Sequence, residues 1–187
     1  MIEYRLRIVQ DDLSENPNDS MDSPAFLLAD HRDFAPKAPK GWSLDRARDL
    51  VELQESGTSE ESDCDRFVVF PLFAYIHSGV SLSMGRSYPF NDHWDSGQIG
   101  YVVVDLDGVC GKIDRANAEE VARGWVETWN QYLSGDVWGY EVSRIDTCSL
   151  GHEHAEVVDS CWGFYGKEYC EQEGKGVLES YQKENAA

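Results

Sequence analysis

The segment "FVVFPLFAYIHSGVSLSM" spans Phe67 to Met84. Its first ten residues are mostly β-branched or aromatic, and its last five alternate between apolar and polar after a turn at Ser78 and Gly79. This pattern predicts a β-hairpin. A further apolar run over residues 99–104 predicts a third strand. Because these strands follow one another with few helices between them, we expect an α+β fold whose antiparallel sheet is packed by two or three helices.

The clearest helical pattern covers residues 117–133. A capping-box pattern begins at Asn117, and Gly135 is suited to end the helix. Trp125 and Trp129 recur on one face, so we expect both indoles to be buried. We expect this helix to lie on one face of a sheet that includes residues 67–75, 99–104 and 137–145. The remaining expected elements are strands over 4–9, 25–29 and 155–160, a helix over 44–53 capped by Ser43, and a short terminal helix over 166–172.

Composition predicts one acidic domain. The chain has 187 residues, of which 41% are hydrophobic, and this is enough for a single core over residues 1–187. Acidic loops are expected at about 10–24 and 54–65. The formal net charge of −19 comes from 35 acidic and 16 basic residues, and it is spread along the whole chain. A charge spread in this way must lie on the folded surface.

Such a surface disfavours two kinds of partner and favours a third. Nucleic acids and anionic membranes repel it, because binding to either depends on Lys and Arg. A basic host protein or a nucleic-acid-binding complex is favoured instead. The alternative is that the acidity only keeps the protein in solution. The sequence leaves the oligomeric state open.

Cysteine usage and the absence of targeting signals indicate the compartment. The five cysteines are odd in number and show no CxxC spacing, so free thiols in a reducing cytoplasm are expected. The N-terminal residues show no secretory signal, and no apolar run is long enough to span a membrane. We therefore expect the cytoplasm of a host bacterial cell.

Four blocks of sequence occur in an order that resembles a known family. They are "FPLFAYIHSGVSLS", "PFNDHWDSGQIGYVVV", "YLSGDVWGYEV" and "DSCWGFYG", and they lie within residues 70–166. The chain resembles a family of small acidic proteins of unknown function that bacteriophages and prophages encode. The segment "QDDLSENPND" after the first expected strand resembles that family too. The resemblance implies a phage origin and a shared fold, and it assigns no catalytic residue.

The run "WDSGQIG" can be interpreted as a site or as a structural turn. As a site, Asp95 and Gln98 would hold a ligand. As a turn, Asp95 or Ser96 would accept backbone N–H bonds, Gly97 would adopt a positive φ, and Trp94 would pack against the core. We favour the turn.

Enzymatic alternatives rest on scattered side chains. Cys161 could act as a nucleophile with His77 or His93 as its base. His152 and His154 could bind a metal ion near Cys148. The spacing matches no common zinc motif, and no nucleotide-binding loop is present. We expect no cofactor, no metal and no catalytic residue.

The sequence therefore predicts a non-enzymatic, phage-encoded acidic binding protein. It would mimic nucleic acid and inhibit a host defence complex of the anti-CRISPR or antirestriction type. An alternative is a hydrolase or metal-dependent enzyme that uses His77, His93, Asp95 and Cys161, and a third option is an accessory protein that binds through exposed aromatic residues. The residues expected to bind the partner are Asp11, Asp12, Glu15, Glu60, Glu61, Asp63 and Asp65.

Overall fold

The computed structural model describes residues 2–20, 22–32, 34–57, 62–91, 94–108 and 111–186. Antiparallel sheets are packed by helices, which confirms the predicted α+β class. The chain forms two compact units. Residues 16–134 are called the inserted unit, because they interrupt the terminal unit, which consists of residues 1–15 and 135–187.

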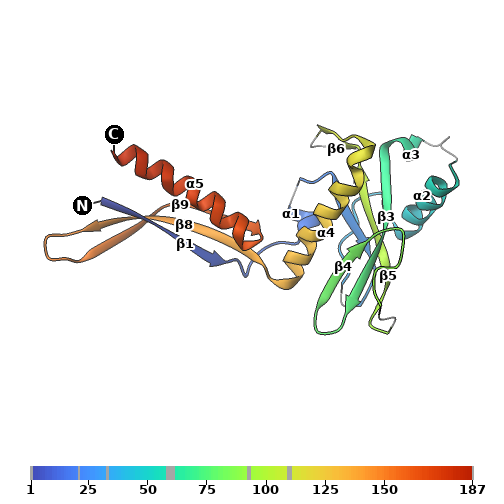
Figure 1. Ribbon diagram of the computed structural model, residues 1–187, viewed down its shortest axis with the longest axis horizontal. Helices are drawn as coiled ribbons and strands as arrows, with labels where there is room; N and C mark the ends of the chain where they lie inside the picture. The colour runs from blue at the N-terminus through green and yellow to red at the C-terminus, as the bar shows by residue number, and fades with distance from the viewer. Residues whose placement is uncertain are drawn as a thin grey trace. The chain divides into compact units, whose positions relative to one another are not determined.

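The inserted unit contains a four-stranded antiparallel sheet in the order β2-β5-β3-β4 (Figure 1). The predicted hairpin is confirmed as β3 (Phe67–Ile76) and β4 (Val80–Met84), which pair from Leu72 to Ile76 of β3. β5 (Ser96–Asp105) lies between β3 and β2 (Ala25–Ala29). Alternate residues of β3 point to opposite faces of the sheet, and both faces are buried, as its nearly continuous apolar sequence requires.

Helix α4 (Ala118–Ser134) covers one face of this sheet. Trp125 and Trp129 are 6% and 2% exposed, which confirms their predicted burial. The start of the helix differs from the prediction, because a 3-10 turn over Arg115–Asn117 precedes it and Asp114 caps that turn. The helix ends before Gly135, which has a φ of 74° as a C-terminal glycine commonly does.

Helix α2 (Leu44–Ser56) covers the opposite face. The Ser43 hydroxyl accepts a hydrogen bond from the Arg46 N–H at 3.2 Å, which confirms the predicted cap. The helix is longer than predicted and ends at Gly57, whose φ is 71°. The two predicted acidic loops contain short helices, namely α1 (Pro17–Ser20) and α3 (Ser62–Arg66), and a small hairpin is formed by β6 (Asp107–Gly108) and β7 (Gly111–Lys112).

The first half of β3 has an edge that no strand covers, because β4 pairs only with its second half. The Gln54 side chain of α2 covers this edge instead. Its amide donates to the Phe67 carbonyl at 3.0 Å, and its oxygen accepts from the Val69 N–H at 3.4 Å. Pro71, which follows at the same edge, has no N–H to leave unpaired. The edge is therefore closed to a further strand.

The terminal unit contains a second antiparallel sheet, in the order β1-β8-β9. β1 (Ile2–Gln10) pairs with β8 (Val137–Thr147) along its whole length, and β9 (Glu153–Tyr165) pairs with the other edge of β8. The prediction that residues 137–145 share a sheet with residues 67–75 and 99–104 is therefore wrong. Strand formation was predicted correctly here, but the pairing partner of a strand depends on contacts that are distant in sequence.

Helix α5 (Lys167–Ala186) lies along the three-stranded sheet (Figure 1). It is much longer than the predicted helix over 166–172. Gly174 and Gly176 disfavour a helix when only the local sequence is considered. Gly174 nevertheless lies against the sheet, and a Cβ atom there would come within 2.8 Å of Leu6 Cδ1 and 3.1 Å of Tyr140 Cβ. The glycine thus lets the helix approach the sheet closely.

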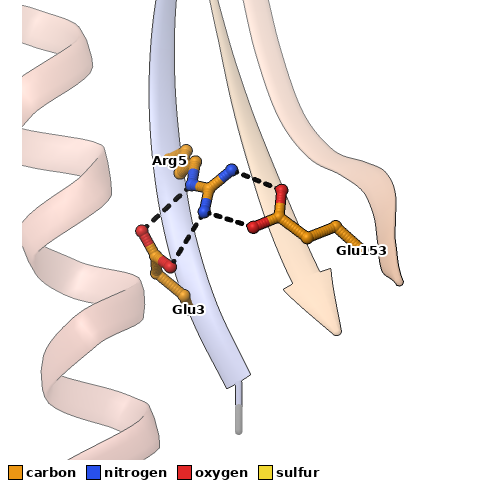
Figure 2. A network of polar contacts seen from close by, with 3 residues as sticks. All are labelled: Glu3, Arg5 and Glu153. Atoms are coloured by element: carbon orange, nitrogen blue, oxygen red, sulfur yellow. Dashed lines mark hydrogen bonds and ion pairs between the residues drawn. The ribbon is translucent and has the colours of Figure 1, made fainter. Parts of the chain in front are cut away.

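An ionic network joins the two outer strands of the terminal unit (Figure 2). The Arg5 guanidinium on β1 donates to both carboxylate oxygens of Glu153 on β9, at 2.7 and 2.8 Å. It also donates to both oxygens of Glu3, at 3.0 and 3.1 Å. These contacts lower the pKa values of both carboxyl groups.

Candidate functional site

Three of the seven predicted partner-binding residues follow β1 in the terminal unit. The Asp11 carboxylate accepts a hydrogen bond from the Leu13 N–H at 3.1 Å, so it also stabilises the local turn. Asp12 and Glu15 are exposed, and neither carboxylate forms an ion pair with a residue that the structure describes. The backbone carbonyl of Glu15 accepts a hydrogen bond from the Tyr165 hydroxyl at 3.3 Å, which fixes the chain at this point.

The other four belong to the inserted unit, around α3. Glu60 and Glu61 lie outside the described residues. Asp63 accepts a hydrogen bond from Arg46 at 2.7 Å, so this carboxylate is already neutralised by a cation. Asp65 is exposed and forms no ion pair within the described part of the chain. The structure therefore places the two predicted acidic groups on different units.

Helix α2 carries a row of carboxylates that was not among the predicted partner-binding residues. Asp45, Asp49, Glu52 and Glu55 are all exposed, and they recur at intervals of three and four residues. Side chains at these intervals lie on one side of a helix, about 5–6 Å apart. The opposite side of α2 is buried against the sheet through Ala47 and Leu50. We call Asp45, Asp49, Glu52 and Glu55 the α2 carboxylate row.

The same periodicity could have revealed this row in the sequence. The spacing of the apolar residues was used to predict the helix, and the polar residues of that helix have the complementary spacing. Their side of the helix must face away from the core once the apolar side is buried. The spacing of the polar residues therefore indicates an acidic outer side of the helix, just as the spacing of the apolar residues indicates the buried side.

Most of the α2 carboxylate row is not neutralised. Asp45 forms an ion pair with Arg48, whereas Asp49, Glu52 and Glu55 form none with any residue of the described ranges. Glu55 lies in the last turn of the helix, which holds no basic residue. The C-terminal end of a helix carries partial negative charge, so an acidic residue there is unfavourable for stability. A Lys or Arg at this position would be more favourable for stability.

The "WDSGQIG" segment differs from its predicted structure. Trp94 is 96% exposed, so its predicted packing is wrong. Gly97 lies in β5 and does not have a positive φ. The Asp95 carboxylate contacts Nδ1 of His77 at 2.8 Å rather than a backbone N–H group, and the Ser96 hydroxyl bonds the Tyr88 hydroxyl. Both partners lie outside the segment, since His77 is in the turn between β3 and β4 and Tyr88 follows β4.

Among the described residues, the structure brings together only two of the four residues named in the enzymatic alternative. His77 and Asp95 are in contact, with side chains 68% and 39% exposed, while His93 lies outside the described residues. Cys161 lies on β9 in the terminal unit, where it is exposed. The structure thus places the proposed nucleophile and the His77–Asp95 pair on different units.

The residues considered as alternative metal ligands, His152, His154 and Cys148, lie at the tip of the β8–β9 hairpin and are all exposed. Backbone N–H groups around the thiol lower the pKa of Cys148. Within the described ranges, no group of three or more His, Cys, Asp or Glu side chains could hold a metal ion. No helix in the described part of the chain is both long enough and apolar enough to cross a membrane.

Comparison with protein-family models, with curated proteins and with solved structures finds no match for this chain.

Proposed function

We propose that this chain is a non-enzymatic, phage-encoded protein that inhibits a host defence complex. Its partner is a basic host protein or a nucleic-acid-binding complex of a CRISPR or restriction system. The carboxylates take the place of nucleic-acid phosphates in the partner's positive groove. Direct binding to nucleic acid or to an anionic membrane is not part of the proposal, because a net charge of −19 repels both.

One observation carries the proposal, namely the α2 carboxylate row. Three of its four members have no cationic partner among the described residues, and Asp65 on the neighbouring helix α3 has none either. A helix is rigid, so a row on its outer side presents charges at fixed spacing. Fixed spacing reduces the entropy lost when a partner binds. The phage origin rests on the four sequence blocks described above.

The steering of such a protein toward its partner is electrostatic. Complementary charge raises association rates well above those of neutral pairs, and salt screens this effect. Binding should therefore be fast at low ionic strength and should weaken as salt is added.

The test compares two variants with the same change in charge. The first carries Asp49→Lys, Glu52→Lys and Glu55→Lys on α2. The matched control carries Glu168→Lys, Glu173→Lys and Glu184→Lys on α5, which are exposed and form no ion pair with described residues. Each variant raises the formal net charge from −19 to −13, because each substitution adds two positive charges.

Two readouts are measured. In cells, the plating efficiency of a phage that is restricted or CRISPR-targeted should rise when the wild-type chain is expressed. In vitro, the chain should displace a fluorescent cognate duplex from a purified type I restriction complex or a purified Cas effector. The α2 variant should associate about tenfold more slowly at low salt, and the α5 control should stay close to wild type.

Three outcomes would contradict the proposal. If the wild-type chain neither protects phage nor displaces DNA, it is not an inhibitor of these complexes. Equal losses in both variants mean that total charge acts and the α2 row does not. Protection that a folded Cys161→Ser or His77→Ala variant loses, while the α2 variant keeps it, favours the enzyme.

A further inference from the structure

The inserted unit contains a cavity of about 440 Å³ beside the uncovered edge of β3. Its apolar wall comes from Leu53 of α2 and from Val68 and Phe70 of β3. A second cavity of about 390 Å³ shares Phe70 with it and also shares Arg86 and Glu119, so the two cavities adjoin. Volumes of this size are typical of small-molecule sites.

The charged groups of the larger cavity are Arg86, Arg115, Asp65 and Glu119. Arg86 forms neither a hydrogen bond nor an ion pair with any described residue. Arg115 donates to the backbone carbonyl of Cys64, which is uncharged, and it forms no ion pair with a described carboxylate. Glu119 accepts from Arg123 at 2.6 Å and is thereby neutralised. Among the described residues, the cavity is therefore lined by two guanidinium groups that form no ion pair and by one unpaired carboxylate, Asp65.

This local excess of positive charge is opposite in sign to the rest of the protein. Most other arginines of the described residues form ion pairs with acidic neighbours, as in the pairs of Arg66 with Asp105 and of Arg46 with Asp63. The chain has 35 acidic residues, so a guanidinium that forms no ion pair within the described ranges is unusual. Guanidinium groups bind phosphate and carboxylate through paired hydrogen bonds, which makes an anion the matching ligand.

We propose that this cavity binds a small molecule that carries one phosphate or carboxylate group on an apolar body. Arg86 and Arg115 hold the anionic group, and Leu53, Val68 and Phe70 contact the apolar body. The site is separate from the proposed inhibitor function, since none of these five residues belongs to the α2 carboxylate row. An experiment can therefore contradict the proposed ligand site without contradicting the proposed inhibitor function, and the reverse also holds.

The test uses calorimetric titration of the full chain with four probes. Phenyl phosphate and benzoate each combine an anion with an aromatic body. Phenol lacks the anion, and inorganic phosphate lacks the body. Phenyl phosphate or benzoate should bind at least tenfold more tightly than phenol and inorganic phosphate, and the tighter of the two identifies the preferred anion.

Arg86→Gln should weaken this binding about tenfold, the usual consequence of losing a charged hydrogen-bond donor. The matched control is Arg48→Gln, which removes the same charge from an exposed arginine that is bound to Asp45 on α2. It should leave binding unchanged. Thermal unfolding of both variants should match wild type, because Arg86 is exposed and forms neither a hydrogen bond nor an ion pair with a described residue.

The proposal is overturned if neither anionic probe binds the wild-type chain, or if phenol or inorganic phosphate binds as tightly as they do. It is also overturned if Arg86→Gln binds phenyl phosphate and benzoate as wild type does. Equal weakening in Arg48→Gln would show that net charge, not the cavity, governs binding, and this too would rule the site out.

Discussion

Arg5 donates hydrogen bonds to both of its acidic neighbours, Glu3 on its own strand and Glu153 on β9 (Figure 2). Neither strand is hydrogen-bonded to the other, since β8 lies between them. The network is thus a side-chain link across the full width of the sheet. An exposed single ion pair contributes little to stability, but a network of paired hydrogen bonds to one guanidinium is better ordered.

The network predicts a dependence of stability on pH. The folded-state pKa values of Glu3 and Glu153 are lowered from 4.5, so the network stabilises the protein fully above pH 4.5. The stabilisation is lost as the pH falls through the lowered values. Glu153→Gln should therefore lower the melting temperature at pH 7, and the difference from wild type should shrink below pH 4.5.

Melting curves of both proteins between pH 2 and pH 7, recorded by circular dichroism, measure this difference. Glu156→Gln is the control, because Glu156 is exposed on the same strand and forms no ion pair with a described residue. A difference for Glu153→Gln that persists unchanged at acid pH would show that the network does not stabilise the sheet.

Trp94 shows how one residue can contradict a general expectation. Large aromatic residues are usually buried to a large extent, and its neighbours in the sequence indicated a tight turn. Instead it is 96% exposed, and the adjacent Asp95 bonds His77 of β3–β4. The contact partner of Asp95 is 18 residues away in the sequence, and local turn chemistry could not have indicated it.

At the scale of elements, α5 depends on a glycine that appears unfavourable. Gly174 lies against Leu6 and Tyr140, whereas a Cβ atom at Gly176 would meet nothing within 4 Å. The two glycines are only two residues apart in one helix, so their intrinsic effects on helix formation are equal. Their surroundings alone distinguish them.

Replacing each glycine with alanine should change the free energy of unfolding in opposite directions. Gly174→Ala should lower the free energy of unfolding by about 1–3 kcal/mol, because the added methyl group overpacks the contact with the sheet. Gly176→Ala should raise it by up to about 1 kcal/mol through helix propensity. Urea unfolding of the two variants measures both values. The same sign in both would mean that α5 does not pack on the sheet at Gly174.

The uncovered edge of β3 gives a second prediction at this scale. Gln54→Ala should destabilise the protein by about 1–3 kcal/mol, since the Phe67 carbonyl and the Val69 N–H would lose their partner. It should also promote aggregation, because an unprotected strand edge can pair with another chain. Glu52→Ala on the solvent side of the same helix is the control for lost helix contacts.

Urea unfolding and light scattering check these two effects. A Gln54→Ala variant as stable and as monodisperse as Glu52→Ala would show that the Gln54 amide does not protect the edge.

In the order of the whole chain, the inserted unit is the segment that joins two antiparallel neighbours, β1 and β8. β1 ends at Gln10 and β8 begins at Val137, and the two strands are antiparallel neighbours that pair at Gln10 and Trp138. The Gln10 side chain also donates to the Gly135 carbonyl at 2.9 Å. The points at which the chain leaves and re-enters the terminal unit are thus side by side in that unit, which is the arrangement that tolerates an insertion.

The two units should fold separately. Residues 16–134 expressed alone should unfold cooperatively, because this segment contains both large buried clusters. Residues 1–15 joined to 135–187 by a Gly/Ser linker should fold with lower stability, since the buried cluster of that unit has only Tyr140, Val142 and Cys170 at its centre. Calorimetry of each fragment measures the outcome.

A fragment over residues 16–95 is the control. It lacks β5 and α4, so it should remain unfolded. A fragment over 16–134 that shows no cooperative transition would mean that its two clusters require the terminal unit.

Features that depend on neighbouring residues could be predicted from the amino-acid sequence. The β3–β4 hairpin, the Ser43 cap, the stop at Gly135 and the buried face of α4 were all predicted correctly. Each is governed by periodicity, capping or backbone conformation, and these act over a few residues. The acidity of the surface was also predictable, because so many charges cannot be buried.

In contrast, the pairing of distant segments and the ion-pair partners of the described charges could not be predicted, because both depend on tertiary contacts. Residues 137–147 have the sequence pattern of a strand, but they pair with β1 and not with β5. The paired residues of β1 and β8 are more than a hundred positions apart in the sequence, so local patterns do not indicate the pairing. The same holds for α5, where Gly174 is favourable only against the sheet. It holds also for two charged side chains. Asp63 is neutralised because Arg46 lies beside it, whereas Arg86 forms no ion pair with a described residue. Side-chain partners are set by packing, and packing depends on the whole chain.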